Sequence, residues 1–234
     1  MLAVKQQSDT KRQKLDSEGD SQAQSKSKAQ PQSHSQAQQC QDQDLRLLKP
    51  FDMRVKHPLE HTWTLWYLEN DRSKSWEELQ NEITSIDMVE DFWSLYNHIK
   101  PPSEIKIGSD YSLFKKGTQP MWEDEANKYG GRWVINRGRG SKVELDKLWL
   151  DVLLILIGEA FDHTEEVCGA VINLRGKTNK ISVWTANGYN EEAVMEIGLK
   201  LRELLCLPPL QLQYQLHKDS MSKQGSVVKA VYCL

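Results

Sequence analysis

The chain has 234 residues, with 30 lysines and arginines against 33 aspartates and glutamates and a formal net charge of −3. That length allows one domain or at most two small ones. The charge balance excludes a protein that binds nucleic acid through a generally basic surface, so any recognition of an anion must be local. The four cysteines, at positions 40, 168, 206 and 233, form no CxxC pair and no ligand spacing, so they predict neither a metal site nor a disulfide framework.

The N-terminal residues Met1–Gln7 lack the apolar segment of a signal peptide. The longest apolar run, Val152–Ile157, is far below the ~18 residues of a membrane span. We therefore expect a soluble protein of a reducing compartment with no membrane partner. The expected location is the cytoplasm, with the nucleus as an alternative because residues 11–14 (Lys-Arg-Gln-Lys) are typical of a nuclear import signal.

The first part of the chain differs in composition from the rest. Residues 1–50 contain many glutamines, serines and lysines and no Phe, Trp or Tyr. Such a segment buries too little apolar surface to offset its ordering entropy, so we predict a disordered leader. The folded domain is expected at residues 51–234.

Several short segments rich in β-branched and aromatic residues predict strands. They are 62–68, 111–114, 132–135, 169–174, 180–185, 212–216 and 228–233. The turn sequence at 176–179 favours antiparallel hairpins, and the glycine-rich segment 136–140 is a candidate for another hairpin tip.

Three segments with apolar residues at helical spacing predict helices at 87–99, 141–161 and 190–205. Strands and helices without a regular βαβ rhythm indicate the α+β class, with one antiparallel sheet and the helices on one face.

The second helix carries two apolar stripes, which favours either full burial or a face for a partner. One stripe is Leu145, Leu148, Val152 and Leu156; the other is Leu150, Leu154, Ile157 and Phe161.

Tryptophan outnumbers phenylalanine by eight to four, and two tryptophans lie in loop-like sequences beside a carboxylate. Trp76 precedes Glu77, and Trp122 precedes Glu123. Indoles with nearby arginines and lysines suit a stacked base that carries phosphates, whereas a purely structural role is the alternative. No nucleophile elbow, metal-hydrolase motif or phosphate-binding glycine loop is present, so neither an enzyme nor a cofactor is expected.

Seven segments, in order and with near-normal spacing, carry a resemblance to one family. They are His57–Tyr67, Val89–Ile99, Asp110–Phe114, Met121–Asp124, Gly130–Trp133, Trp149–Glu159 and Lys180–Trp184. Together they closely resemble the eukaryotic translation initiation factor 4E family, the mRNA cap-binding proteins. The resemblance runs from about Phe51 to the C-terminus and leaves the leader outside it.

This resemblance implies a curved antiparallel sheet of about eight strands, with three helices on the convex face and the cap site on the concave face. Trp76 and Trp122 match the two indoles that sandwich 7-methylguanine, and Glu123 matches the carboxylate that accepts hydrogen bonds from the guanine edge. Trp184 matches the residue that touches the N7-methyl group. The residues that match phosphate ligands are Arg175 and Lys180, with Arg132 and Lys177 in supporting or water-mediated roles.

The resemblance also implies a partner surface on the opposite face of the sheet. In the family it receives a short helix bearing Tyr-x-x-x-x-Leu-apolar, from scaffold factor 4G or from 4E-binding repressor proteins. The matching residues are His57, Pro58, Val89, Trp93, Leu150, Asp151, Leu154 and Gly158. Asp151 stands where the family usually has Glu, and Ser226 matches a C-terminal serine that kinases phosphorylate.

Two functions stay open at this point. One is an adaptor that binds the 7-methylguanosine cap and recruits factor 4G to initiate translation. The other is a cap-binding paralogue that represses or stores mRNA without productive scaffold recruitment. Trp93 and Leu150 favour the adaptor, because both match the scaffold-binding surface.

Overall fold

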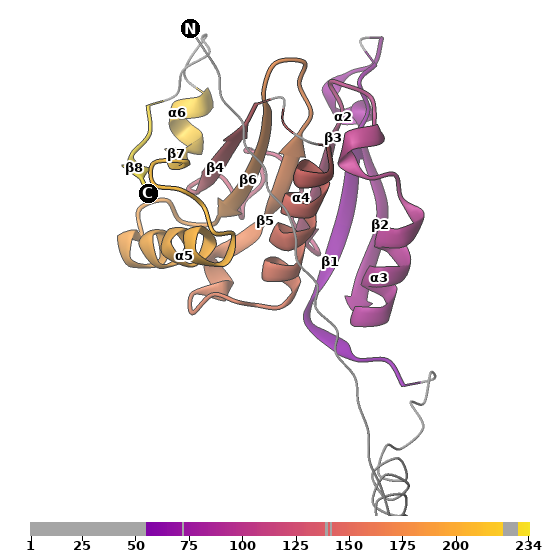
Figure 1. Ribbon diagram of the computed structural model, residues 1–234, viewed down its shortest axis with the longest axis horizontal. Coiled ribbons are helices and arrows are strands. Elements are labelled where there is room, and N and C mark those ends of the chain that lie inside the picture. Colours follow the sequence, from indigo (N-terminus) through magenta and orange to yellow (C-terminus); the bar gives the residue numbers. More distant parts are fainter. Residues whose placement is uncertain (1–54, 72, 139, 141, 222–228) are drawn as a thin grey trace, which may run out of the picture. The chain divides into compact units, whose positions relative to one another are not determined.

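The computed structural model describes residues 55–221 and 229–234, except 72, 139 and 141. The predicted leader (residues 1–50), the boundary near residue 51 and the predicted phosphorylation site Ser226 lie outside the described residues. The described residues form one antiparallel sheet with helices packed on one face (Figure 1). The predicted α+β class is confirmed.

Eight strands make up one curved sheet, and all neighbouring strands are antiparallel. Their order is β2-β1-β3-β5-β6-β4-β7-β8. The strands are β1 (Pro58–Leu68), β2 (Gln80–Met88), β3 (Asp110–Lys115), β4 (Gly131–Arg137), β5 (Val167–Asn173), β6 (Asn179–Thr185), β7 (Leu212–Leu216) and β8 (Tyr232–Cys233). The tight β5–β6 hairpin agrees with the turn predicted at 176–179.

Two features of the sheet differ from the sequence prediction. Strand β2 was not predicted, because its side chains are mostly polar and exposed, and only Ile86 is buried. It is held as an edge strand by backbone pairing to β1. The hairpin expected at 136–140 is wrong: this segment leads from β4 into a helix, and β4 pairs with β6 and β7 instead.

Three longer helices cover one face of the sheet, as predicted (Figure 1). They are α3 (Val89–His98), α4 (Lys142–Ile157) and α5 (Glu191–Leu204). The Asn190 side chain caps α5 by accepting a hydrogen bond from the Ala193 N–H at 3.3 Å. The connections also contain the short helices α2 (Trp76–Leu79) and α6 (His217–Met221) and two 3-10 turns, η1 (Pro102–Glu104) and η2 (Thr164–Glu166), which were not predicted.

Helix α4 is buried more completely than its two predicted stripes imply. Ile157 and Phe161, both from the second stripe, are only 8% and 5% exposed and belong to the core. Leu154 is 36% exposed and Leu150 is half-buried. The helix lies between α3 and α5 over the sheet, so its flanks also meet neighbours (Figure 1). Any partner face on α4 is therefore narrower than the pattern predicts.

The side chains of each strand alternate between the two faces of the sheet. Trp63, Leu113, Trp133 and Val183 point to the helix side and join the main core. On the opposite face, Phe114, Cys168, Val171 and Trp184 form a smaller buried cluster, against which the β3–β4 connection packs. The helix-free face thus has a packed floor on which a site can be built.

Candidate functional site

Three rows of side chains cross the helix-free face, and each row joins residues that are paired across neighbouring strands. The row nearest the β5–β6 turn contains Leu68, Asp110, Asn173 and Lys180. The next contains Ser112, Val171 and Ser182, and the third contains Phe114, Gly169, Trp184 and Arg132. The register therefore brings together residues that are more than 60 positions apart in the sequence.

A cavity of about 230 Å³ opens over these rows. Its lining includes four of the predicted cap residues, namely Trp122, Glu123, Arg132 and Trp184. It also includes Asp110 and Asn173, which the sequence analysis did not single out. The cavity combines an aromatic floor, a carboxylate and a guanidinium group.

Trp184 forms part of the cavity floor and is held from two sides. Its ring lies 5.4 Å from that of Phe114 in an edge-to-face arrangement and 4.3 Å from that of His217. Gly169 permits this packing, because a Cβ there would lie 2.5 Å from the Phe114 ring and 2.4 Å from the carbonyl oxygen of Leu113. Trp184 is only 4% exposed, so its position is fixed before any ligand arrives.

His217 is fully buried behind Trp184, and neither ring nitrogen has a hydrogen-bond partner among the described residues. Burial, with a smaller contribution from the charge of Arg132, lowers the pKa of His217 from 6.5 to about 3. The histidine is therefore neutral in the folded protein at physiological pH. The sequence analysis missed it because nothing in the sequence indicates its burial.

We expect His217 to make folding stability depend on pH. Below pH 6.5 the unfolded chain binds a proton at this residue that the folded chain does not, so stability falls as the pH is lowered. Between pH 7 and pH 5 the loss should be about 2 kcal/mol. Urea unfolding at several pH values should show that the stability of His217→Phe depends less steeply on pH than that of the wild type. An unchanged slope in His217→Phe would contradict this assignment.

The β3–β4 connection presents Trp122 and Glu123, and two polar side chains fix its shape. Asp124 accepts hydrogen bonds from the backbone N–H groups of Gln119 (3.0 Å) and Ala126 (2.9 Å). The fully buried Asn127 donates to the carbonyl oxygens of Gln119 (2.9 Å) and Met121 (2.8 Å). These bonds hold the loop without using Glu123.

Glu123 is exposed and has no hydrogen-bond or ion-pair partner among the described residues, so both of its oxygens can accept from a ligand. Trp122 is half-buried and packs against the cluster formed around Trp184. A flat ring beside a free carboxylate is suited to a planar ligand with hydrogen-bond donors on its edge.

Arg132 supplies a positive charge that the protein does not neutralise. Burial lowers its pKa, its Nε has no hydrogen-bond partner, and it forms no ion pair with a described carboxylate. Its guanidinium carbon lies 6.0 Å from the Trp122 ring centre. This half-buried cation is partly removed from water and has no acidic partner, so an anion bound here would be favoured.

Lys180 adds a second positive charge on the same face. Burial, followed by repulsion from Arg132 and Arg175, lowers its pKa. A bound anion would offset this repulsion and favour the protonated, charged form of Lys180.

Arg175 is already engaged with a carboxylate. Its Nη1 and Nη2 donate to the two oxygens of Asp110 at 2.5 and 3.0 Å, and Asn173 also donates to Asp110 at 2.8 Å. The side chain of Arg175 nevertheless remains 45% exposed. Asp110 thus orients Arg175 at the edge of the cavity and offsets part of its charge.

Of the other four predicted cap residues, Arg175, Lys177 and Lys180 are not among those that line the cavity, and the side chain of Trp76 lies outside the part of the chain that the structure describes. Trp76 begins the short helix α2, and Lys177 is exposed on the β5–β6 turn. Their roles stay predictions.

The residues predicted for the partner surface lie on the start of β1, on α3 and along α4. His57 is tied to α3, because its backbone N–H donates to Glu90 (2.9 Å) and its Nδ1 contacts the other oxygen of Glu90 (2.6 Å). Trp93 is 39% exposed on α3, and Val89 precedes it by one turn. Asp151 accepts a hydrogen bond from Lys147 at 2.6 Å.

The remaining members of this set continue the surface along α4. Leu154 is exposed, and Gly158 donates from its N–H to the Leu154 carbonyl oxygen at 3.0 Å. A Cβ at Gly158 would lie 2.8 Å from that oxygen, so this helix end requires glycine. Pro58 is exposed at the first position of β1, and Leu150 is half-buried.

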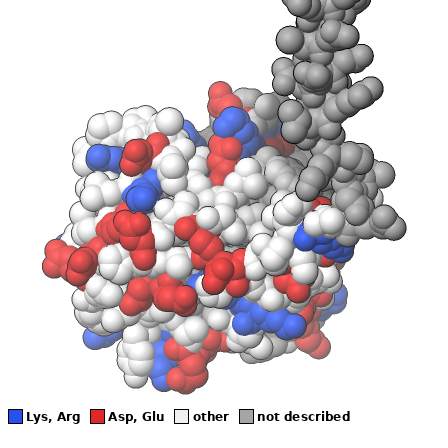
Figure 2. All heavy atoms as spheres, turned by 90° about the horizontal axis from the view of Figure 1, so that it is seen from below, with Lys and Arg blue, Asp and Glu red and all other residues white. Residues whose placement is uncertain are grey.

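Charge is divided between the two ends of the sheet. Figure 2 views the domain from below, and acidic side chains predominate on that face. The α4–β5 connection at this end contains Glu159, Asp162, Glu165 and Glu166. The opposite end carries the β5–β6 turn with Arg175, Lys177 and Lys180. A polyanion is therefore expected to bind near the β5–β6 turn.

The described residues contain neither a metal site nor a membrane-spanning helix. No group of three or more histidine, cysteine, aspartate or glutamate side chains is placed to hold a metal ion. None of the described helices has the length and apolar character needed to cross a membrane.

Solved structures of related proteins share this fold. Ascaris suum eIF4E-3 in complex with the m7G cap matches with a TM-score of 0.70 and 44% identity, over 76% of this chain and 97% of that one. Schistosome eIF4E complexed with m7GpppA and 4E-BP matches with a TM-score of 0.72 and 33% identity, over 77% of this chain and all of that one.

Known proteins with similar sequences are named as members of the same family as these solved structures. Drosophila melanogaster eukaryotic translation initiation factor 4E1 is 73% identical over 180 residues, which are 76% of this chain and 70% of that protein. Human eukaryotic translation initiation factor 4E is 50% identical over 178 residues, covering 75% of this chain and 82% of that protein. The family model of eukaryotic initiation factor 4E matches residues 58–231. With a matching family model over most of its length and a relative at 73% identity, this chain belongs to the eukaryotic initiation factor 4E family.

Proposed function

We propose that this protein binds the 7-methylguanosine cap of mRNA and recruits the scaffold factor 4G to initiate translation. One observation carries the cap assignment: a half-buried indole, a free carboxylate and a half-buried guanidinium group without an acidic partner line the same cavity. Solved relatives with this fold hold the m7G cap or m7GpppA, as described above. Membership of a family of translation factors also confirms the expectation that the protein is not an enzyme.

The aromatic and acidic groups suit the methylated base. Methylation at N7 makes guanine cationic, which adds a cation–π energy of ~0.5–2 kcal/mol to ordinary stacking of ~1–3 kcal/mol per base. Trp122 would provide one stacking face and Trp76 the other, with Trp184 against the methyl group. Glu123 would accept from the N1–H and the exocyclic amine of guanine, a pair of donors that adenine lacks.

The basic groups suit the phosphate chain that follows. Arg132 lines the cavity, Lys180 lies on the same face of the sheet beside Asn173, and Asp110 holds Arg175 at the edge of the cavity. Lys177, on the adjacent turn, would act at longer range or through water. Binding then requires no covalent step.

Replacing Glu123 by glutamine should weaken cap binding by ~1.5–3 kcal/mol, because an amide cannot accept equally from two guanine donors. The control is Glu125→Gln, two residues away, where the carboxylate is exposed and pairs with Lys128. Fluorescence titration with 7-methylguanosine triphosphate measures both variants. Equal affinity of wild type and Glu123→Gln would refute the proposed base contact.

Scaffold recruitment distinguishes the adaptor from a repressing or storing paralogue. We favour the adaptor because Trp93 and Leu154 expose apolar surface beside Gly158, on the helix-covered side of the sheet. The same surface would also accept 4E-binding repressor proteins, and a schistosome relative was solved with 4E-BP. Co-precipitation of factor 4G by this protein on 7-methylguanosine resin tests the choice: capture of the cap without the scaffold would favour the paralogue role.

The adaptor role would place the protein in the cytoplasm, where translation occurs. Phosphorylation of Ser226 is a further expectation from the family resemblance. A phosphate on Ser226 would add about −1.5 to −2 charges to the protein and so would disfavour binding of the anionic cap.

A further inference from the structure

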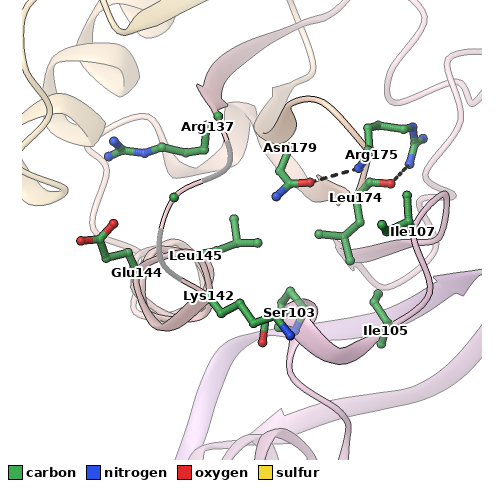
Figure 3. Close-up of a pocket in the computed structure, with 14 residues that line it drawn as sticks. Ser103, Ile105, Ile107, Arg137, Lys142, Glu144, Leu145, Leu174, Arg175 and Asn179 are labelled. Atoms are coloured by element: carbon green, nitrogen blue, oxygen red, sulfur yellow. Dashed lines mark hydrogen bonds between the residues drawn. The ribbon is translucent and has the colours of Figure 1, made fainter.

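A second groove, of about 800 Å³, lies between η1, the β4–α4 connection, the first turn of α4 and the β5–β6 turn (Figure 3). It is larger than the cap cavity, and the cap assignment leaves it without a ligand. Cap binding therefore does not explain which residues line this groove.

Three basic residues line this groove, namely Arg137, Lys142 and Arg175. Arg137 and Lys142 form no ion pair with any described carboxylate, and Glu144 is the single acidic residue among the described lining residues. Arg175 forms an ion pair with Asp110, which offsets part of its positive charge. The groove thus has a net positive charge that favours an anionic ligand.

The floor of the groove is aliphatic. Leu174 is 4% exposed, and Ile105 and Leu145 are half-buried. In Figure 3, Leu145 and Leu174 point toward one another from α4 and from the end of β5. No aromatic side chain lines it among the described residues, so a ribose or a base would lie on aliphatic groups and guanidinium planes with little sequence preference.

The cap cavity and the groove meet the same strand end from opposite faces of the sheet. Asn173 lines the cap cavity, and the next two residues, Leu174 and Arg175, line the groove. Arg175 touches both sites, because its guanidinium group binds Asp110 of the cap cavity. A phosphate chain that leaves the cap cavity would pass Arg175 and turn over the edge of the sheet to reach the groove, because the Leu174 side chain faces the helix side.

The groove is also preformed. Ser103 of η1 donates to Asp146 of α4 from its backbone N–H (2.8 Å) and its hydroxyl (2.6 Å). On the other wall, the Gly108 N–H donates to the Leu174 carbonyl oxygen at 2.7 Å, and the Asn179 side chain accepts from the Arg175 N–H at 3.0 Å (Figure 3). Fixed walls lower the entropy lost on binding.

We propose that this groove binds the first nucleotides that follow the cap, with Arg137 and Lys142 contacting backbone phosphates. The proposal rests on the cap-binding function and extends it from the cap nucleotide to capped RNA. It accounts for the net positive charge, for the aliphatic floor and for the position of Arg175 between the two sites.

The test compares two ligands, 7-methylguanosine triphosphate and a capped RNA of five nucleotides, on the full chain at several salt concentrations. Wild type should bind the capped RNA more tightly. The double variant Arg137→Ala/Lys142→Ala should lose about fivefold in RNA affinity, and the slope of log K against log salt should fall by about 1.4, or ~0.7 for each lost phosphate contact. Its affinity for 7-methylguanosine triphosphate should stay within about twofold of wild type, since neither residue lines the cap cavity.

The matched control is Lys116→Ala/Lys200→Ala, which removes two lysines that do not line the groove and should leave both affinities unchanged. Equal losses for the two ligands, or no loss for RNA, would overturn the proposal. Loss of scaffold-protein binding with unchanged RNA affinity would also overturn it and would make the groove a site for an acidic peptide. If wild type binds 7-methylguanosine triphosphate but gains nothing from the added nucleotides, only this inference fails. If it binds neither ligand, the proposed function fails as well.

Discussion

Trp122→Ala should weaken binding of 7-methylguanosine triphosphate by ~2–3 kcal/mol, because the variant loses both base stacking and the cation–π interaction with the methylated ring. The loss corresponds to an affinity ratio of roughly 30 to 150. Isothermal titration calorimetry measures it. Trp76→Ala is expected to behave alike if the base lies between two indoles.

Two variants separate stacking from general damage to the loop. Trp122→Phe keeps an aromatic face and should recover part of the lost affinity. Asp124 and Asn127 hold the loop independently of Trp122, so the alanine variant should remain folded. Near-wild-type retention of Trp122→Ala on cap resin would refute the assignment of this cavity.

The sequence predicts well those parts of the fold in which burial and local pattern agree. Strand β7 begins and ends at the predicted residues, and helices α3 and α5 differ from prediction by one or two residues at each end. Strand β2 could not be predicted, since an exposed polar edge strand is specified by the backbone of β1 and not by its own side chains. The burial of Ile157 and Phe161 also depends on which elements flank α4, and helical periodicity carries no such information.

In the candidate site, too, some residues can be predicted from the local sequence, whereas others depend on the whole fold. Trp122 and Glu123 stand out in the sequence because a large indole and a carboxylate occur in a loop. Asp110, Asn173 and His217 do not, because their importance arises from cross-strand register and from burial. A single aspartate at the start of a strand gives no signal that it will face an arginine 65 residues later. Pairing across a sheet is a property of the whole fold.

Trp93→Ala should abolish binding of a scaffold peptide bearing Tyr-x-x-x-x-Leu-apolar, with a loss of at least ~2 kcal/mol, the size typical of a tryptophan hot spot. Trp93 is 39% exposed and packs edge-to-face with Phe92 at 5.1 Å and with Tyr96 at 6.2 Å. These neighbours hold the indole in place, so the peptide would meet a rigid apolar side chain on α3. Peptide binding by fluorescence anisotropy is the measurement.

Trp93 and Trp122 serve as controls for one another, because they lie on opposite faces of the sheet. Trp93→Ala should keep full cap affinity, and Trp122→Ala should keep full peptide affinity. Leu199→Ala, which removes a 45%-exposed apolar side chain from α5, should change neither. Loss of cap binding in Trp93→Ala would mean that this tryptophan supports the fold, since a side chain on the helix face can reach the cap cavity only by disturbing the sheet between them.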